Sequence, residues 1–144
     1  AYLSMKRWND AIDALTPLLD EHLYSTPFIL HNNLGYAYRA LHQTETAMKE
    51  FKTAVFLNPR FCLGMYNIGE TYEQMGDTRA AVKNFKKAVD KCPNYTDAYY
   101  RLGVAYEKNG RVNEAVAFYR QCMKFGGETL TADRCRQRVE GDVL

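Results

Sequence analysis

Four cysteines are the residues of this chain with the widest range of possible chemistry. They stand at positions 62, 92, 122 and 135. A thiol can bind a metal ion, act as a nucleophile, take part in redox chemistry or form a disulfide. No two of the four have the spacing of a zinc knuckle or of a CxxC motif. A metal site and a thiol redox centre are therefore not predicted.

Carboxylates form the second group that could do chemistry. Glu70, Glu73 and Glu107 could act as acid and base only if the fold placed two of them around a substrate pocket. The sequence shows nothing that would bury them or provide such a pocket. A glycosidase-like role is therefore not predicted.

A row of lysines is the third group. Lys83, Lys87 and Lys91 stand four residues apart, with Lys86 beside them. On a helix this spacing places the three side chains on one face. Such a row favours a solvated outer face, and the alternative is a patch that binds an acidic partner.

The composition is that of an ordinary globular protein. The 144 residues fit one domain, and the formal net charge of +2 offers no electrostatic reason to expect nucleic acid or an anionic membrane as a partner. The apolar runs are far shorter than the roughly 20 residues of a membrane-spanning helix, and no basic-then-apolar leader is visible.

Small and aromatic residues recur 34 positions apart. The sets are Gly35, Gly69 and Gly103; Tyr38, Tyr72 and Tyr106; Ala47, Ala81 and Ala115; and Phe51, Phe85 and Tyr119. Small residues let two helices approach closely, and an aromatic four residues after each alanine fills the space beside it. Pro59 and Pro93 end the second helix of a pair. The pattern resembles the tetratricopeptide repeat, TPR. The resemblance implies an all-α fold, a right-handed superhelix of antiparallel helix pairs.

The repeat register predicts a single TPR domain over residues 1–144, with repeats at 28–61, 62–95 and 96–129. Residues 6–22, KRWNDAIDALTPLLDEH, read as a second helix bent at Pro17. AYLSM then reads as the remnant of the partner helix, so residues 1–25 form a truncated repeat and the chain is expected to begin inside a longer protein. Residues 130–140, LTADRCRQRVE, read as a short capping helix with arginines on its outer side.

Within this register the cysteines fall into two pairs. Cys62 opens the first helix of the middle repeat and Cys92 closes the second, and antiparallel helices bring those ends together. Cys122 lies about one turn before a glycine loop and Cys135 about two turns after it, so they face each other across a helical hairpin. Two disulfides are predicted, which indicates an oxidising compartment. The alternative is that the cysteines are unrelated buried thiols.

No catalytic function is predicted for these residues. The histidines, His22, His31 and His42, lie toward the other end of the expected stack from most of the cysteines, and a nucleophile needs a nearby base. No phosphate-binding loop is present either. We therefore predict no enzyme activity, no cofactor and no metal ligands.

The TPR resemblance also implies a partner-binding groove lined by the first helix of each repeat. Its implied residues are Ile29, Asn32, Tyr36, Arg39, Leu63, Tyr66, Glu70, Glu73, Asp97, Tyr100, Glu107 and Lys108. The tyrosines offer rigid amphipathic contact area, although a chain with 11 tyrosines must place some there in any case.

Some TPR adaptors hold the C-terminal carboxylate of a chaperone in this groove. Asn67 and Arg101 match the pattern of such a clamp. Asn32 and Asp97 stand where lysines are expected, and Tyr36 stands where an asparagine is expected. An aspartate would repel a carboxylate, so the chaperone clamp is not predicted.

An irregular connection suggests a narrower resemblance. Ala11 and Ala47 are 36 residues apart rather than 34, and LLDEHLYSTPFILHNNLG follows WNDAIDAL. This stretch resembles the type IV pilus pilotins of the PilF, PilW and Tgl type. The resemblance implies a monomeric lipoprotein on the periplasmic face of the outer membrane, anchored through a lipid outside this chain, that assists the assembly or localisation of the pilus secretin. The alternative is a cytoplasmic TPR adaptor, or a TPR segment of a larger regulatory protein or enzyme.

Overall fold

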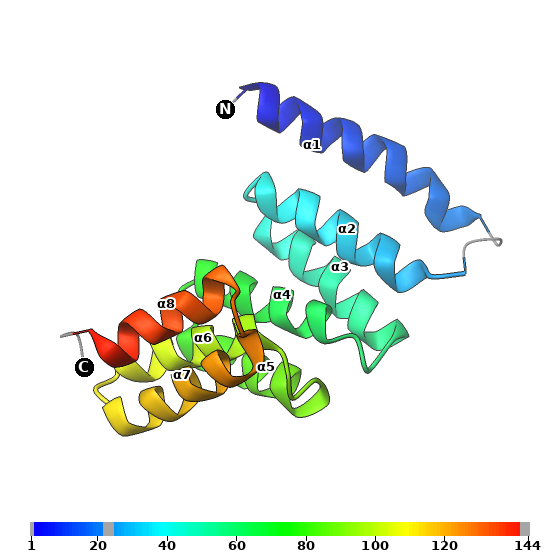
Figure 1. Ribbon diagram of the computed structural model, residues 1–144. Helices are drawn as coiled ribbons and strands as arrows, with labels where there is room; N and C mark the ends of the chain where they lie inside the picture. Colours follow the sequence, from blue (N-terminus) through cyan, green and yellow to red (C-terminus); the bar gives the residue numbers. More distant parts are fainter. Residues whose placement is uncertain (1, 22–24, 142–144) are drawn as a thin grey trace. The chain divides into compact units, whose positions relative to one another are not determined.

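The computed structural model describes residues 2–21 and 25–141, and the regular structure in these ranges is helical throughout. The elements are α1 (Tyr2–Leu15), the 3₁₀ helix η1 (Thr16–Asp20), α2 (Pro27–Ala40), α3 (Thr44–Leu57), α4 (Cys62–Gln74), α5 (Thr78–Lys91), α6 (Thr96–Lys108), α7 (Val112–Gly126) and α8 (Leu130–Glu140) (Figure 1). The predicted all-α fold is confirmed. Helices α4 and α6 begin at the residues where the repeat register starts its second and third repeats.

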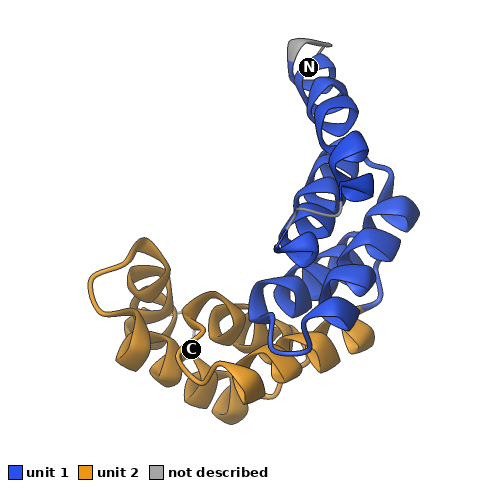
Figure 2. Ribbon diagram, turned by 90° about the vertical axis from the view of Figure 1, so that its right-hand side faces the viewer, with its two compact units in different colours: residues 1–77 blue, residues 78–144 orange. Residues whose placement is uncertain are grey.

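The chain folds as two compact units, residues 1–77 and 78–144 (Figure 2). The first unit contains α1 to α4, and the second contains α5 to α8. The boundary falls between the two helices of the middle predicted repeat.

The first unit is built around the close contact of α2 with α3. A Cβ added at Gly35 would lie 2.7 Å from the ring of Phe51, which is fully buried. Ala47 and Met48 pack with this ring and with Ile68 of α4. The small residue on one helix therefore accommodates the aromatic ring of the other, as the repeat pattern predicts.

The second unit repeats this arrangement in α6 and α7. Gly103 lies directly against the ring of Tyr119, which leaves no room there for a side chain. Tyr119 and Ala115 are fully buried. Helix α5 packs on α6. Ala81 and Phe85 of α5 are buried.

The N-terminal helix differs from its prediction. Residues 2–15 form one continuous helix, α1, because the stretch contains neither proline nor glycine. The expectation that AYLSM is the remnant of a separate helix is therefore wrong. The bend predicted at Pro17 takes the form of η1, whose backbone is wound more tightly. His22 lies outside the described residues.

Helix α8 occupies the place of a further first helix. It begins 34 residues after α6 and packs against both α6 and α7. Gln137 stands 34 residues after Gly103, in the slot that elsewhere receives an aromatic ring, and it is exposed. Thr129 caps the helix by accepting a hydrogen bond from the backbone N–H of Ala132. A polar side chain in that slot is compatible with a capping helix, and the capping role stays a prediction.

Candidate functional site

The first unit contains a cleft of about 420 Å³ between α1, α2 and α4. Its lining residues are Trp8, Ala11, Leu15, Asn32, Asn33, Tyr36, Ala37, Leu63 and Asn67. None of these side chains is charged. Three of the predicted groove residues, Asn32, Tyr36 and Leu63, thus come together in one cleft.

An aromatic pair forms one wall of this cleft. The rings of Trp8 and Tyr36 lie 5.5 Å apart at an interplanar angle of 59°. Tyr36 is 48 % exposed, and Leu63, which also lines the cleft, is 42 % exposed. The repeat register did not predict Trp8, because it assigned groove residues only to first helices. The sequence did offer one signal for Trp8. It is the single tryptophan of the chain and stands three residues before Ala11, which occupies the first alanine position of the repeat pattern.

The deep side of the cleft is polar and internally bonded. The Asn67 side-chain amide donates to Oδ1 of Asn32 over 2.8 Å, and both residues are at least nine-tenths buried. The Thr71 hydroxyl donates to the backbone carbonyl of Asn67 over 2.7 Å. Two helices 35 residues apart in sequence are therefore held together by a side-chain hydrogen bond.

Two charged groove residues pair with each other beside this asparagine bond. The Arg39 guanidinium lies 2.9 Å from a carboxylate oxygen of Glu70 and donates to the carbonyl of Asn67 over 3.3 Å. Its Cζ also lies 5.3 Å from the ring centre of Tyr36 and 5.4 Å from that of Phe51. Arg39 and Glu70 are thus engaged inside the fold, so they supply no free charge to the cleft.

In the second unit, α8 engages two other predicted groove residues. The Thr131 hydroxyl donates to Asp97 over 2.7 Å. The Arg138 guanidinium lies 3.2 Å from Glu107, which also accepts a 2.6 Å hydrogen bond from the Tyr119 hydroxyl. The side chain of Glu107 is only 15 % exposed. The sequence offered no reason to expect burial of Glu70, Glu73 or Glu107. For Glu107 this expectation is wrong.

This network changes the ionisation of Tyr119. Burial raises the pKa of its hydroxyl well above the usual value, and the hydrogen bond to Glu107 raises that pKa further. Both causes disfavour a phenolate, the first because a buried charge loses its solvation and the second because Glu107 is itself an anion. Tyr119 therefore remains a hydrogen-bond donor to Glu107 at neutral pH.

The remaining predicted groove residues do not join the cleft. Ile29 is exposed on α2, and Lys108 is exposed at the end of α6. Tyr66, Glu73 and Tyr100 are half-buried.

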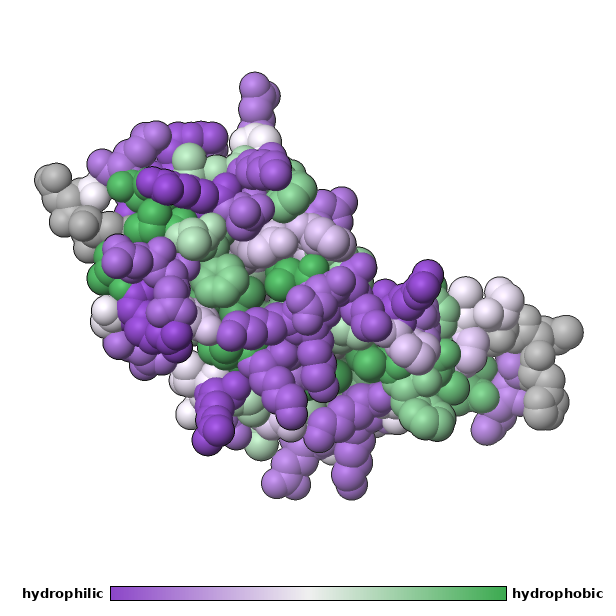
Figure 3. Space-filling model, turned by 90° about the horizontal axis from the view of Figure 1, so that it is seen from below, coloured by the Kyte–Doolittle hydropathy of each residue, from purple (hydrophilic) through white to green (hydrophobic). Residues whose placement is uncertain are grey.

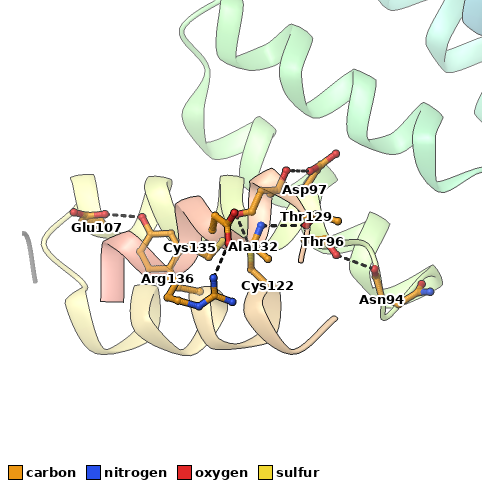
Figure 4. The surroundings of a disulfide bond; sticks show 12 residues. Asn94, Thr96, Asp97, Glu107, Cys122, Thr129, Ala132, Cys135 and Arg136 are labelled. Atoms are coloured by element: carbon orange, nitrogen blue, oxygen red, sulfur yellow. Dashed lines mark hydrogen bonds and ion pairs between the residues drawn. A yellow bond between two sulfur atoms is a disulfide. The ribbon is translucent and has the colours of Figure 1, made fainter. Parts of the chain in front are cut away.

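The cysteines are disulfide-bonded. Cys122 and Cys135 form a disulfide that links α7 to α8, with a Cα–Cα distance of 6.3 Å (Figure 4). Both are fully buried. Cys62 and Cys92 are disulfide-bonded as well, so none of the four thiols is free. Their pairing with each other stays a prediction.

Metal ligation and membrane insertion each need a specific arrangement of side chains. Over residues 2–21 and 25–141, no three His, Cys, Asp or Glu side chains are grouped so that they could hold a metal ion. In the same part of the chain, no helix is both long and apolar enough to cross a membrane.

Comparisons with known proteins agree with the repeat pattern. A TPR repeat model matches residues 74–110, and a tetratricopeptide repeat model matches residues 30–61 and 96–125. No curated protein sequence matches the chain. The pilotin resemblance stays a prediction.

Solved structures share the fold. The crystal structure of MamA has 26 % identity and a TM-score of 0.74, and the match covers 87 % of this chain and 72 % of MamA. A tetratricopeptide repeat protein from Parabacteroides merdae has 16 % identity and a TM-score of 0.78, with coverage of 98 % and 57 %. The Arabidopsis OM64 TPR domain has 22 % identity and a TM-score of 0.69, with coverage of 78 % and 93 %. The tetratricopeptide repeat models together match more than half of the chain, which therefore belongs to the tetratricopeptide repeat family, whose helix pairs form scaffolds for protein binding.

Proposed function

We propose that this chain is a non-enzymatic scaffold that binds a protein partner in the cleft between α1, α2 and α4. The observation that carries the proposal is the half-exposed aromatic and aliphatic wall made by Trp8, Tyr36 and Leu63. Aromatic side chains in a concave surface supply much of the binding energy in protein interfaces. The fixed Asn32–Asn67 bond behind the wall keeps the surface preorganised.

The chemistry of the cleft selects an uncharged, largely apolar segment of the partner. Its lining carries no charge, and the nearby Arg39 is already paired with Glu70. A partner that inserted a carboxylate would lose hydration without gaining an opposite charge. The exposed Asn33 amide can donate to or accept from the partner backbone.

For the identity of the partner, we infer the secretin of the type IV pilus, with the chain acting as a pilotin at the periplasmic face of the outer membrane. The LLDEHLYSTPFILHNNLG connection supports this inference. The disulfides support it too, because disulfides persist in oxidising compartments such as the periplasm. The chain would act as a monomer, held at the membrane by a lipid outside these residues.

Capture of purified secretin fragments tests this function. Tyr36→Ala and Leu63→Ala are each expected to weaken capture about tenfold, because each removes one exposed side chain from the apolar wall of the cleft. Phe56→Ala is the matched control, since Phe56 is 82 % exposed on α3 and does not line the cleft. It is expected to bind like the wild type.

Two outcomes separate the parts of the proposal. Equal capture by the wild type and by both cleft variants would remove the cleft from the binding account. If no secretin fragment is captured while an apolar peptide binds in a Tyr36-dependent manner, the pilotin role fails, and a generic TPR adaptor with the same cleft is supported instead.

A further inference from the structure

Helix α5 carries an unusual concentration of positive charge. Its residues Thr78–Lys91 include five cationic side chains and one carboxylate, Asp90. The cations are Arg79, Lys83, Lys86, Lys87 and Lys91, and all are exposed. The whole chain has a formal net charge of only +2, so the remaining residues are net negative. Helix α5 thus carries a net positive charge, whereas the rest of the chain is net negative.

The lysine row is not neutralised by the fold. Within the described residues, no carboxylate forms an ion pair with Lys83, Lys87 or Lys91. Elsewhere in the second unit, cations do have acidic partners, as the Arg136–Asp133 pair at 2.6 Å shows. The α5 row therefore keeps its charge available to an external anion.

A small cleft at the first turn of α5 adjoins the lysine row and adds Arg79 to it, whereas Arg111 on the same cleft is paired with Glu114. It has a volume of about 320 Å³ and is lined by Thr78, Arg79, Val82, Tyr106, Asn109 and Arg111. The buried ring of Tyr106 has Lys86 Nζ at 5.2 Å and Arg111 Cζ at 4.6 Å from its centre. Hydrophilic side chains cover much of the molecular face drawn in Figure 3.

We propose that the α5 row, Lys83, Lys87 and Lys91, with the adjoining cleft is a second docking surface, which binds an extended acidic polypeptide segment. Positions four apart on a helix are about 6 Å apart along its axis. Alternate side chains of an extended strand are about 6.7 Å apart on one side. An extended segment with an acidic residue at every second position would therefore place successive carboxylates beside successive lysines.

Other anionic partners fit this surface less well. A membrane-surface helix needs large apolar side chains that can enter the lipid, whereas Ala81, Phe85 and Ala88 of α5 are buried in the protein. Single-stranded nucleic acid is bound on exposed aromatic platforms, whereas Tyr106 is only 7 % exposed. The proposal does not depend on the cleft of the first unit, so its failure would leave the proposed function unaffected.

Fluorescence anisotropy with two labelled peptides tests this surface. One peptide alternates glutamate and threonine over about 12 residues, and the other has the same composition with all glutamates in one block. The wild type is expected to bind the alternating peptide about tenfold more tightly than the block peptide, and raising the salt should weaken this binding.

Charge reversal completes the test. The triple variant Lys83→Glu, Lys87→Glu and Lys91→Glu is expected to lose at least tenfold in affinity for the alternating peptide. The matched control reverses three exposed cations elsewhere, Lys49, Lys52 and Arg134, so its net charge is the same, and it should lose less than threefold. A Lys→Gln triple variant at the same α5 positions serves if charge reversal disturbs folding, as judged by circular dichroism.

The proposal is overturned if the two peptides bind equally, because the spacing of the row would then be irrelevant. It is also overturned if the control variant loses as much affinity as the α5 variant. Tighter binding to phosphatidylglycerol vesicles or to an oligothymidylate than to the alternating peptide would assign the surface to a membrane or to nucleic acid instead.

Discussion

The disulfide between α7 and α8 offers the sharpest test of how the second unit is stabilised. The perturbation is the double replacement Cys122→Ala and Cys135→Ala. Alanine fits the Cys122 slot, because the equivalent positions of the other repeats hold the fully buried Ala54 and Ala88. The change should therefore remove the covalent link with little loss of packing.

The expected magnitude follows from the length of the closed loop. The two cysteines are 13 residues apart in sequence, and the loop-entropy relation gives about 3 kcal/mol for a loop of this length. For a protein of this size, such a loss lowers Tm by about 6–12 °C. The Thr131–Asp97 and Arg138–Glu107 bonds remain, so α8 should stay helical and docked at room temperature.

Guanidinium titration followed by circular dichroism measures the difference. The double variant is expected to unfold at a lower denaturant concentration than the wild type when no reductant is present. A second double variant, Cys62→Ala and Cys92→Ala, keeps the α7–α8 link. It should therefore lose stability on adding reductant, whereas the Cys122/Cys135 variant would already have lost this contribution.

A loss below about 1 kcal/mol in the Cys122→Ala and Cys135→Ala variant would refute the reasoning. It would mean either that the disulfide does not form in the protein or that the unfolded chain is already restricted near α8.

Three further predictions concern packing, ionisation and cysteine pairing. Gly35→Ala should lower the free energy of unfolding by about 1–3 kcal/mol, because the new Cβ would lie 2.7 Å from the Phe51 ring; an unchanged urea midpoint would show that the ring can move aside. The pKa of Tyr119 is raised above its ordinary value of 10.0, so its contribution to stability is complete below pH 10 and is lost as the pH rises through the higher folded pKa. The stability advantage of the wild type over Tyr119→Phe should accordingly shrink above pH 10, and a constant difference in melts across that range would contradict the assignment. Non-reducing peptide mapping should find Cys62 linked to Cys92, and a link from either to another cysteine would disprove the pairing.

Much of the fold could be predicted because the repeat pattern is itself a packing rule. Gly35 recurs as Gly103, and Phe51 recurs as Tyr119. Each glycine meets its aromatic partner in the structure. Contacts of this kind are set by residue size at fixed spacing, so they can be read from one chain.

The candidate site was less predictable because hydrogen bonds between helices are not visible in spacing. The resemblance placed Asn32, Arg39 and Glu70 in an open groove, whereas the structure bonds them to partners within the first unit. Glu107 was likewise expected to be open, but it is held by Arg138 of α8. Trp8 was missed because it lies outside the first helices. Side-chain partners of this kind depend on the three-dimensional approach of helices, which a linear pattern does not encode.

The Asn32–Asn67 hydrogen bond has a consequence for the uniqueness of the fold. Leucines at both positions could bury apolar surface equally well, so the pair adds little to the net free energy of folding. Sliding α2 along α4 by one turn would keep many apolar contacts but would leave two buried amides unpaired. The amide pair thus penalises misaligned stacking of similar helices far more than it strengthens the correct one. Because the repeats of this chain are similar in sequence, this penalty favours the native pairing of α2 with α4 over pairings with the equivalent helices of other repeats.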